Sequence, residues 1–290
     1  MNWRALLASV LLLAIVGGCN QSDVGYGGKK RPKGYANVVS LSPSTTEYVI
    51  GLGSGNLLVG RTAASDRPPQ IKTVPIVVVD QRPDPEKILA QNPDLIVYDK
   101  ALYSDDEIAK IKALGIETME YDPRTVEDYA DFGYRLAAKL ADETTFAEHI
   151  DAVYREVADA RATPTTDPKT TILLGDGNGN YLVMGVDGFH ANLFKICGGV
   201  PVGVPGPRFA PINIEKLIDL NPEVVYAGDE EALKILKDPR LQGIKAVKEH
   251  HVYPYDERTL LRMSMALNKI IKDFSHDIAT LPTYDPGAKK

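Results

Sequence analysis

One thirteen-residue pattern occurs twice in this chain and constrains its fold more than any other feature. EKILAQNPDLIVY at 86–98 returns as EKLIDLNPEVVYA at 215–227, with Glu, Lys, Asn and Pro at the same places. Each copy predicts the end of a short helix, a turn and a buried strand. The offset of 129 residues is too long for one unit of a stacked repeat array. We therefore predict two similar lobes, each containing the pattern once.

Short apolar runs alternate with amphipathic helix patterns in both halves of the sequence. Examples of the runs are NVVSL at 37–41, PIVVV at 75–79 and DLIVY at 94–98, and SDDEIAKIKALG at 104–115 is one of the helix patterns. Continuous apolar strands separated by helices predict parallel sheets that are covered on both faces. The predicted fold class is therefore α/β.

Two helix patterns follow one another without a strand between them and interrupt this alternation. They are TVEDYADFGYRLAAKL and DETTFAEHIDAVYREVADARA, and the second would be about 30 Å long as a helix. Two α/β lobes joined by one long helix predict a ligand cleft between the lobes and a stiff hinge. The predicted organisation is an N-terminal lobe at 37–141, a connecting helix at 142–163, a C-terminal lobe at 164–282 that ends in one helix over 260–281, and a tail at 283–290.

Residues 1–19 form a separate unit. Arg4 precedes an apolar run over Ala5–Val16, which would span about 18 Å as a helix, short of a hydrocarbon core of roughly 30 Å. This pattern predicts an export signal. Its end, Val-Gly-Gly-Cys, resembles a bacterial lipobox, which implies lipidation of Cys19, a polar tether at 20–36 and anchoring to a membrane surface that faces the periplasm or extracytoplasmic space. A plain secretory signal with an incidental cysteine is the alternative.

Composition and cysteine content exclude several classes. The 33 basic and 39 acidic residues give a net charge of −6, so we expect no nucleic-acid partner. With Cys19 lipidated, only Cys197 remains, in the apolar NLFKICGG, so we predict a buried, unreactive thiol and no disulfide. We expect a monomer.

Other patterns bear on chemistry, and we expect neither a catalytic residue nor a metal site from them. GDGNGN at 175–180 lacks the helix that a dinucleotide loop needs, and Tyr181 stands where a calcium loop needs glycine, so we predict a loop at the edge of the cleft. Of the five histidines only His190 is expected to face the cleft, which is too few for a bare-metal site. No G-x-S-x-G turn is present.

Four motifs in order resemble the substrate-binding lipoproteins of ABC importers for cobalamin, ferric siderophores and haem. They are VVSLSPSTTEYVIGLGSGNLLVGRT, EKILAQNPDLIVY, LFKICGG and DPRLQGIKAVKEHHVYPYD, and together with their flanks they span about 37–281. The resemblance implies two Rossmann-like lobes, a backbone helix, little hinge motion, no catalysis and no resident cofactor. The cobalamin-binding members are the most similar in detail, although an aromatic residue of theirs would fall near Ala64 and their disulfide partner in the last helix is absent.

Aromatic and basic residues in loops after strand ends are the candidate ligand contacts, because ligands of open α/β sheets collect there. A flat macrocycle or a catecholate chelate favours aromatic walls, and its negative charge favours arginine. The candidates are Arg61, Tyr98, Tyr103, Tyr181, Met184, Arg208, Phe209, Tyr255, Arg258 and Arg262.

The glutamates that begin the two repeat copies have a separate expectation. The resemblance implies that Glu86 and Glu215 engage arginines on the two halves of a permease dimer, and pseudo-symmetry would place them on one rim of the cleft. The alternative is that each stabilises the positive end of its helix.

The sequence therefore predicts a lipid-anchored protein that captures a metal chelate and delivers it to an ABC permease. A corrinoid such as cobalamin leads over a ferric siderophore and haem. A metal-dependent extracytoplasmic enzyme and a ligand-sensing receptor subunit are the alternatives from other classes.

Overall fold

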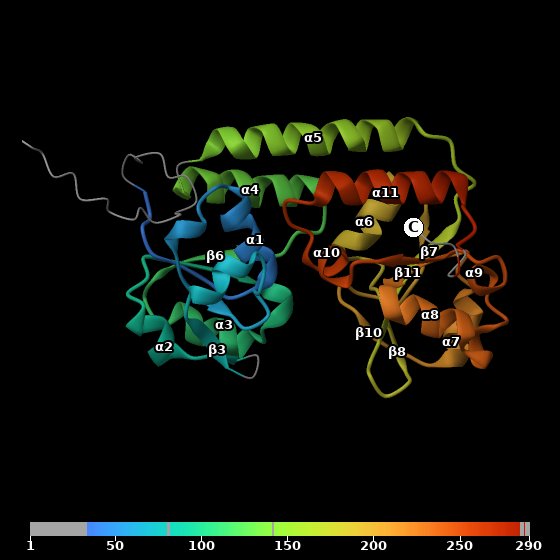
Figure 1. Cartoon of the computed structure of the whole chain (residues 1–290), viewed down its shortest axis with the longest axis horizontal. Helices are drawn as coiled ribbons and strands as arrows, with labels where there is room; N and C mark the ends of the chain where they lie inside the picture. Colours follow the sequence, from blue (N-terminus) through green and yellow to red (C-terminus); the bar gives the residue numbers. More distant parts are fainter. Residues whose placement is uncertain (1–33, 80–81, 141, 285–286, 288–290) are drawn as a thin grey trace, which may run out of the picture.

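The computed structural model describes residues 34–79, 82–140, 142–284 and 287, and Figure 1 shows two α/β lobes side by side beneath one long helix. Cys19, the export signal and most of the 20–36 tether lie outside the described residues. Among the described helices, none is both long enough and apolar enough to cross a membrane.

The N-terminal lobe is built on a six-stranded sheet with the order β4-β3-β2-β1-β5-β6. All neighbours are parallel except β3 and β4. Its elements are β1 Val38–Ser40, α1 Pro43–Gly51, η1 Gly55–Leu57, β2 Leu58–Thr62, η2 Pro69–Thr73, β3 Ile76–Val79, β4 Arg82–Pro83, α2 Pro85–Ala90, β5 Leu95–Asp99, η3 Lys100–Leu102, α3 Asp105–Lys112, β6 Glu117–Tyr121 and α4 Val126–Leu140.

The C-terminal lobe has a second six-stranded sheet with the order β10-β8-β7-β11-β12, in which β9 also pairs with β7. Its elements are β7 Lys169–Gly175, β8 Tyr181–Val183, α6 Phe189–Ile196, β9 Val200–Pro201, β10 Ala210–Ile212, α7 Ile214–Leu220, β11 Val224–Gly228, α8 Asp229–Lys237, η4 Pro239–Leu241, α9 Lys245–Lys248, β12 Val252–Tyr255, α10 Glu257–Arg262 and α11 Leu267–Thr280. Strands β7, β9, β11 and β12 are parallel, as predicted, whereas β8 and β10 are antiparallel additions.

The antiparallel strand β8 exists because GDGNGN forms a hairpin turn. The Asp176 carboxylate accepts the backbone N–H groups of Asn178 at 2.7 Å and Asn180 at 3.0 Å, so the side chain closes the turn itself. The described walls of the cleft pockets do not include this turn, which corrects the expectation of a loop at the cleft edge.

The two copies of the repeat occupy equivalent places, as predicted. Helix α2 leads into β5 beside the first strand of its lobe, and α7 leads into β11 beside β7. The recurring Asn has a structural reason, because Asn92 and Asn221 both take the left-handed conformation, with φ of 49° and 42°. Asn tolerates that conformation better than most residues, and the following Pro prevents the helix from continuing.

Helix α5, Glu143–Ala162, joins the lobes and runs above both of them (Figure 1). It packs on α4 of the N-terminal lobe and on α6 and α11 of the C-terminal lobe. Its Phe146 ring lies directly on Gly133 of α4, where a Cβ atom would come within 1.9 Å of the ring. A single hydrophobic cluster therefore extends from the first lobe through α4 and α5 into the second.

The final helix is broken, which corrects the prediction of one helix over 260–281. Helix α10 ends at Arg262, and Met263 takes a left-handed conformation with φ of 40° before α11 begins at Leu267. Two N-terminal-lobe hydroxyls bind carbonyls of the broken segment: Tyr121 donates to Met263 at 2.5 Å, and Tyr129 donates at 2.9 Å to Ser264, whose carbonyl also accepts the Leu267 amide. Hydrogen bonds from the other lobe thus help to satisfy the backbone carbonyls at the break.

Candidate functional site

The cleft between the lobes lies at the carboxyl ends of the N-terminal-lobe strands. It is lined by residues within one position of the ends of β1, β2, β3, β5 and β6, which are Leu41, Thr62, Val78, Asp99 and Asp122. This is where open α/β sheets bind their ligands. The opposite wall comes from the C-terminal lobe, chiefly from α10 and from the loop that contains Arg208 and Phe209.

Helix α10 divides the cleft into two compartments of about 510 and 360 Å³, both within the usual size range of ligand pockets. The larger contains Ser44, Ala64, Tyr103 and Arg258, and the smaller contains residues such as Arg124, Phe189, His190, Arg208 and Phe209. The side chains shared by both are Asp99, Leu102, Leu261 and Arg262. Leu102 and Leu261 are 53% and 36% exposed, so apolar surface faces the space from both lobes.

Arginines cross the cleft to the N-terminal lobe. Arg208 donates to the Lys100 carbonyl at 3.0 Å, and Arg258 donates to the Asp66 carboxylate at 2.7 Å. Both side chains lie at solvent-exposed positions, so a negatively charged ligand could compete for them at little cost.

Arg262 makes a different, partly buried set of contacts, which we call the clasp (Arg262, Glu47, Asp66 and Ser264). Its guanidinium donates to Glu47 at 2.5 Å and to the Ala64 carbonyl at 3.0 Å, and it lies 3.6 Å from Asp66. The Ser264 hydroxyl also donates to the Glu47 carboxylate. The clasp fixes the broken segment between α10 and α11 to helix α1 of the other lobe.

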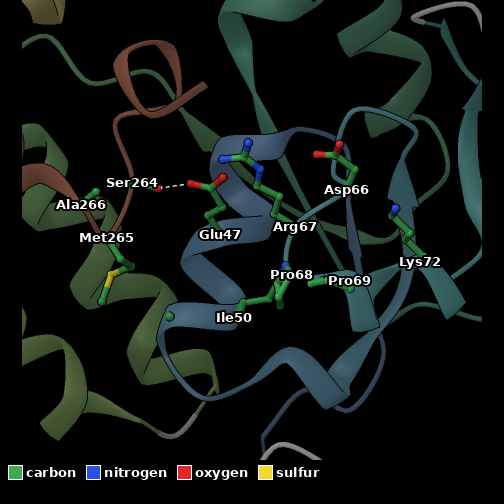
Figure 2. Close-up of a pocket in the computed structure, with 11 residues that line it drawn as sticks. Glu47, Ile50, Asp66, Arg67, Pro68, Pro69, Lys72, Ser264, Met265 and Ala266 are labelled. Carbon is green, nitrogen blue, oxygen red and sulfur yellow. Dashed lines mark hydrogen bonds between the residues drawn. The ribbon is translucent and has the colours of Figure 1, made fainter. Parts of the chain in front are cut away.

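A groove of about 750 Å³ lies next to the clasp and outside the cleft. Figure 2 shows Glu47 bonded to Ser264 at its edge, with Met265 on one side and Pro68 and Pro69 on another. Its walls come from α1, from η2 with the residues before it, and from the 264–266 segment, and not from strand ends. The groove therefore lies away from the strand ends where open α/β sheets bind their ligands, which makes the cleft the candidate ligand site.

Asp99 lines the candidate site, although the sequence did not single it out. It is partly buried at the end of β5 and lines both compartments, where it accepts the Ala101 N–H at 2.9 Å. Burial, aided by the nearby Asp122 carboxylate, raises the pKa of Asp99 to about 6. The floor of the cleft therefore gains a negative charge as the pH rises through that value. The sequence feature that could have identified Asp99 is its position as the first polar residue after the apolar strand LIVY at 95–98.

His190 faces the smaller compartment, as expected. Its Nε2 lies 2.8 Å from the Leu260 carbonyl, which can only accept, so Nε2 carries the proton. Burial lowers the pKa of His190 to about 4, and the ring is therefore neutral at physiological pH.

Five of the ten candidate contacts line the cleft: Tyr103, Arg208, Phe209, Arg258 and Arg262. Tyr103 is only 4% exposed, and its hydroxyl is bonded to the Leu41 carbonyl. The other five do not line either compartment.

Four of these five form hydrogen bonds outside the cleft, and the fifth is buried in the core. Arg61 is buried and donates to the carbonyls of its own loop at Thr62, Ser65 and Val74. The tyrosine hydroxyls are bonded to carboxylates, with pairs Tyr98–Glu120 at 2.8 Å, Tyr181–Asp238 at 2.9 Å and Tyr255–Asp273 at 2.8 Å. Met184 lies in the shared core. Tyr98 does not reach the cleft because neighbouring side chains of a strand point to opposite faces, and Asp99 takes the face that lines the cleft.

Glu86 and Glu215 are exposed near the starts of α2 and α7. The helix N-termini are capped by other residues, since Asp84 accepts from the Glu86 and Lys87 amides and Asn213 accepts from the Lys216 amide. Within the described part of the chain, neither glutamate side chain forms a hydrogen bond or an ion pair. Figure 1 places both helices on the side of their lobes away from α5.

Comparison with known proteins gives a family match over most of the chain. A family model described as "Periplasmic binding protein" matches residues 38–259. The vitamin B12-binding protein of Photorhabdus laumondii is 28% identical over 213 residues, which are 69% of this chain and 74% of that protein. An uncharacterised ABC transporter substrate-binding lipoprotein of Bacillus subtilis is 24% identical over 262 residues, covering 86% and 81% of the two chains.

Solved structures share the fold. The periplasmic vitamin B12-binding protein of Vibrio cholerae has a TM-score of 0.71 at 21% identity, over 84% of this chain and 98% of that one. A periplasmic haem-binding protein from Roseiflexus also has a TM-score of 0.71, at 24% identity and the same coverage. At these identities the likeness extends to the two-lobe architecture.

Proposed function

The chain belongs to the periplasmic binding protein family, and from that premise we propose that it captures a metal chelate in the interlobe cleft and delivers it to an ABC permease. The observation that carries this proposal is the two-compartment cleft at the strand ends. Its apolar surfaces come from both lobes, and the two arginines that cross it, Arg208 and Arg258, are exposed. Apolar walls suit a flat macrocycle, and arginines suit its carboxylates or net negative charge.

A corrinoid is our first choice of ligand. It is supported by the vitamin B12-binding names of several relatives, among them those of Photorhabdus laumondii and Vibrio cholerae. A corrin ring with its side chains is larger than either compartment alone. Binding would therefore displace Leu261 and the Arg208 and Arg258 contacts, so that the two compartments become one site.

Haem is the second candidate, and His190 is the observation that favours it. The imidazole faces the smaller compartment, is neutral, and could bind iron through a ring nitrogen if it left the Leu260 carbonyl. Arg208 and Arg258 would then suit the propionates.

The rest of the proposal concerns export and transfer. We propose that Cys19 is lipidated and holds the protein at the membrane, and that Glu86 and Glu215 meet cationic residues on the two halves of a permease dimer. The capping of both helices by Asp84 and Asn213 leaves these glutamates available for that role.

The test is a ligand titration followed by absorbance. The single tryptophan, Trp3, precedes Cys19, so the mature chain contains none, and tryptophan quenching is not a usable signal. Cyanocobalamin, haemin and a ferric catecholate each have their own visible spectrum, and we expect tight one-to-one binding of cyanocobalamin. Haemin binding that is lost in His190→Ala would transfer the assignment to haem. Failure of all three to bind, together with a colourless protein from native cells, would refute chelate binding.

A further inference from the structure

Two exposed aliphatic side chains occupy the same position in the two copies of the repeat. Aligning Glu86 with Glu215 places Leu89 opposite Ile218, three residues further on in each helix. Leu89 is 51% exposed and Ile218 is 41% exposed. Single exposed hydrophobic residues are normal on protein surfaces. Here the exposure is duplicated at equivalent points of two lobes.

The rotation of both helices is fixed by a buried neighbour. Ile88 in α2 and Leu217 in α7 are completely buried in their lobes. Residues three apart in a helix share a face, so Leu89 lies beside Glu86 and Ile218 lies beside Glu215. Each lobe therefore presents a carboxylate and an aliphatic side chain together, which we call the acid–aliphatic patch.

Neither member of the patch is needed for the fold within its own lobe. The helices are capped by Asp84 and Asn213, and their inward anchors are Ile88 and Leu217. Among the other exposed hydrophobic residues of the described chain, Leu102 and Leu261 line the cleft, whereas Ile76 and Val200 lie in strands outside the repeat. Leu89 and Ile218 thus leave apolar surface exposed at equivalent positions of the two lobes, beside the buried anchors of the same helices.

We propose that Leu89 and Ile218 are the apolar halves of two equivalent docking patches for the permease dimer. The inference rests on the proposed function and adds a contact to it. Helices α2 and α7, which carry the two patches, both lie on the side of the molecule away from α5 (Figure 1), so we expect that a partner with two equivalent sites can engage both at once. The exposed carboxylates would pair with cationic side chains on that partner. The aliphatic side chains would pack into an apolar depression next to each cation.

The two members of a patch have different effects on binding kinetics. Exposed charges mainly accelerate association in a salt-dependent way. Buried aliphatic contacts mainly slow dissociation. The proposal therefore predicts that removing the aliphatic side chains changes the dissociation rate and leaves the salt dependence of association as it is.

The test compares three double variants of the full chain, loaded with cyanocobalamin, in binding to the cognate permease–ATPase complex in nanodiscs. Leu89→Ser with Ile218→Ser should weaken binding by about thirty-fold through faster dissociation. The matched control, Ile76→Ser with Val200→Ser, removes one exposed aliphatic from each lobe outside the repeat and should stay within about two-fold of wild type. Glu86→Lys with Glu215→Lys should reduce the association rate and its salt dependence.

The outcomes separate this inference from the function on which it rests. If the lysine variant loses permease binding while the serine variant binds like its control, the inference is wrong and the proposed function stands. If the loaded wild-type chain does not bind the permease at all, both are wrong. If sedimentation shows that wild type dimerises and the serine variant does not, the patches join two copies of this chain, which also overturns the inference.

Discussion

Replacing Arg262 by Met tests whether the clasp is a structural tie between the lobes. The Arg262 side chain is 9% exposed and has contacts to Glu47, Asp66 and the Ala64 carbonyl. Its loss leaves a partly buried Glu47 carboxylate and a carbonyl without their charged donor. Breaking such a set costs about 2–4 kcal/mol of the free energy of unfolding. For a chain of this size that corresponds to a melting temperature lower by about 8 °C.

The chain supplies a matched control one turn away on the same helix. Arg258 also pairs with an N-terminal-lobe carboxylate, Asp66, but its side chain is 48% exposed. Arg258→Met should therefore change the free energy of unfolding by less than about 1 kcal/mol. Denaturant unfolding of both variants measures the contrast. A double-mutant cycle of Arg262→Met with Glu47→Gln should give a coupling of about 1–2 kcal/mol.

Two results would refute this reasoning. Equal stability of the Arg262→Met and Arg258→Met proteins would mean that burial does not distinguish the two arginines. Unchanged stability of Arg262→Met with loss of cyanocobalamin binding would make Arg262 a ligand contact, as its sequence position first suggested.

Three further predictions concern the cleft and the anchor. Because burial raises the pKa of Asp99 to about 6, its ionisation destabilises the native state above that pH. Asp99→Asn should therefore raise the free energy of unfolding near neutral pH by about 2–3 kcal/mol. In denaturant titrations this gain should disappear as the pH falls from about 6 to about 4. A gain that is constant with pH would contradict this. Tyr103→Ala should weaken chelate binding by about 1–3 kcal/mol in calorimetry, whereas Tyr181→Ala should lower only the melting temperature; equal losses of affinity would place the ligand elsewhere. Cys19→Ala should move the protein from the membrane to the soluble fraction, and a variant that still partitions wholly with membranes would disprove lipidation.

The sequence predicted the lobes because the information for them is local and repeated. Alternating strand and helix patterns locate the elements, and the duplicated segment identifies α2–β5 and α7–β11 as equivalents. The broken C-terminal helix was not predictable in this way. The segment Met263–Ala266 contains good helix formers. Its left-handed turn is stabilised by hydrogen bonds from the hydroxyls of Tyr121 and Tyr129, which lie more than 130 residues away in the sequence.

The site was predicted less completely for a related reason. A sequence pattern indicates that a residue lies near a strand end, but the face is decided by one position of register. Tyr98 therefore turns to Glu120 while Asp99 lines the cleft. Arg61 is bonded to loop carbonyls and Tyr181 is bonded to Asp238. Sequence spacing alone does not identify these partners.

The hydrophobic core that runs unbroken from lobe to lobe has a consequence for signalling. Since α4, α5, α6 and α11 share one packed interior, we expect the separation between α2 and α7 to change little when the cleft is occupied. A membrane receptor that senses only the spacing of its two contact points would read the same value from a full and an empty carrier. Discrimination between a full and an empty carrier would then depend on a small element that the ligand itself displaces. Helix α10 lines both compartments of the cleft and ends at the break, so it is the segment whose position ligand binding would change.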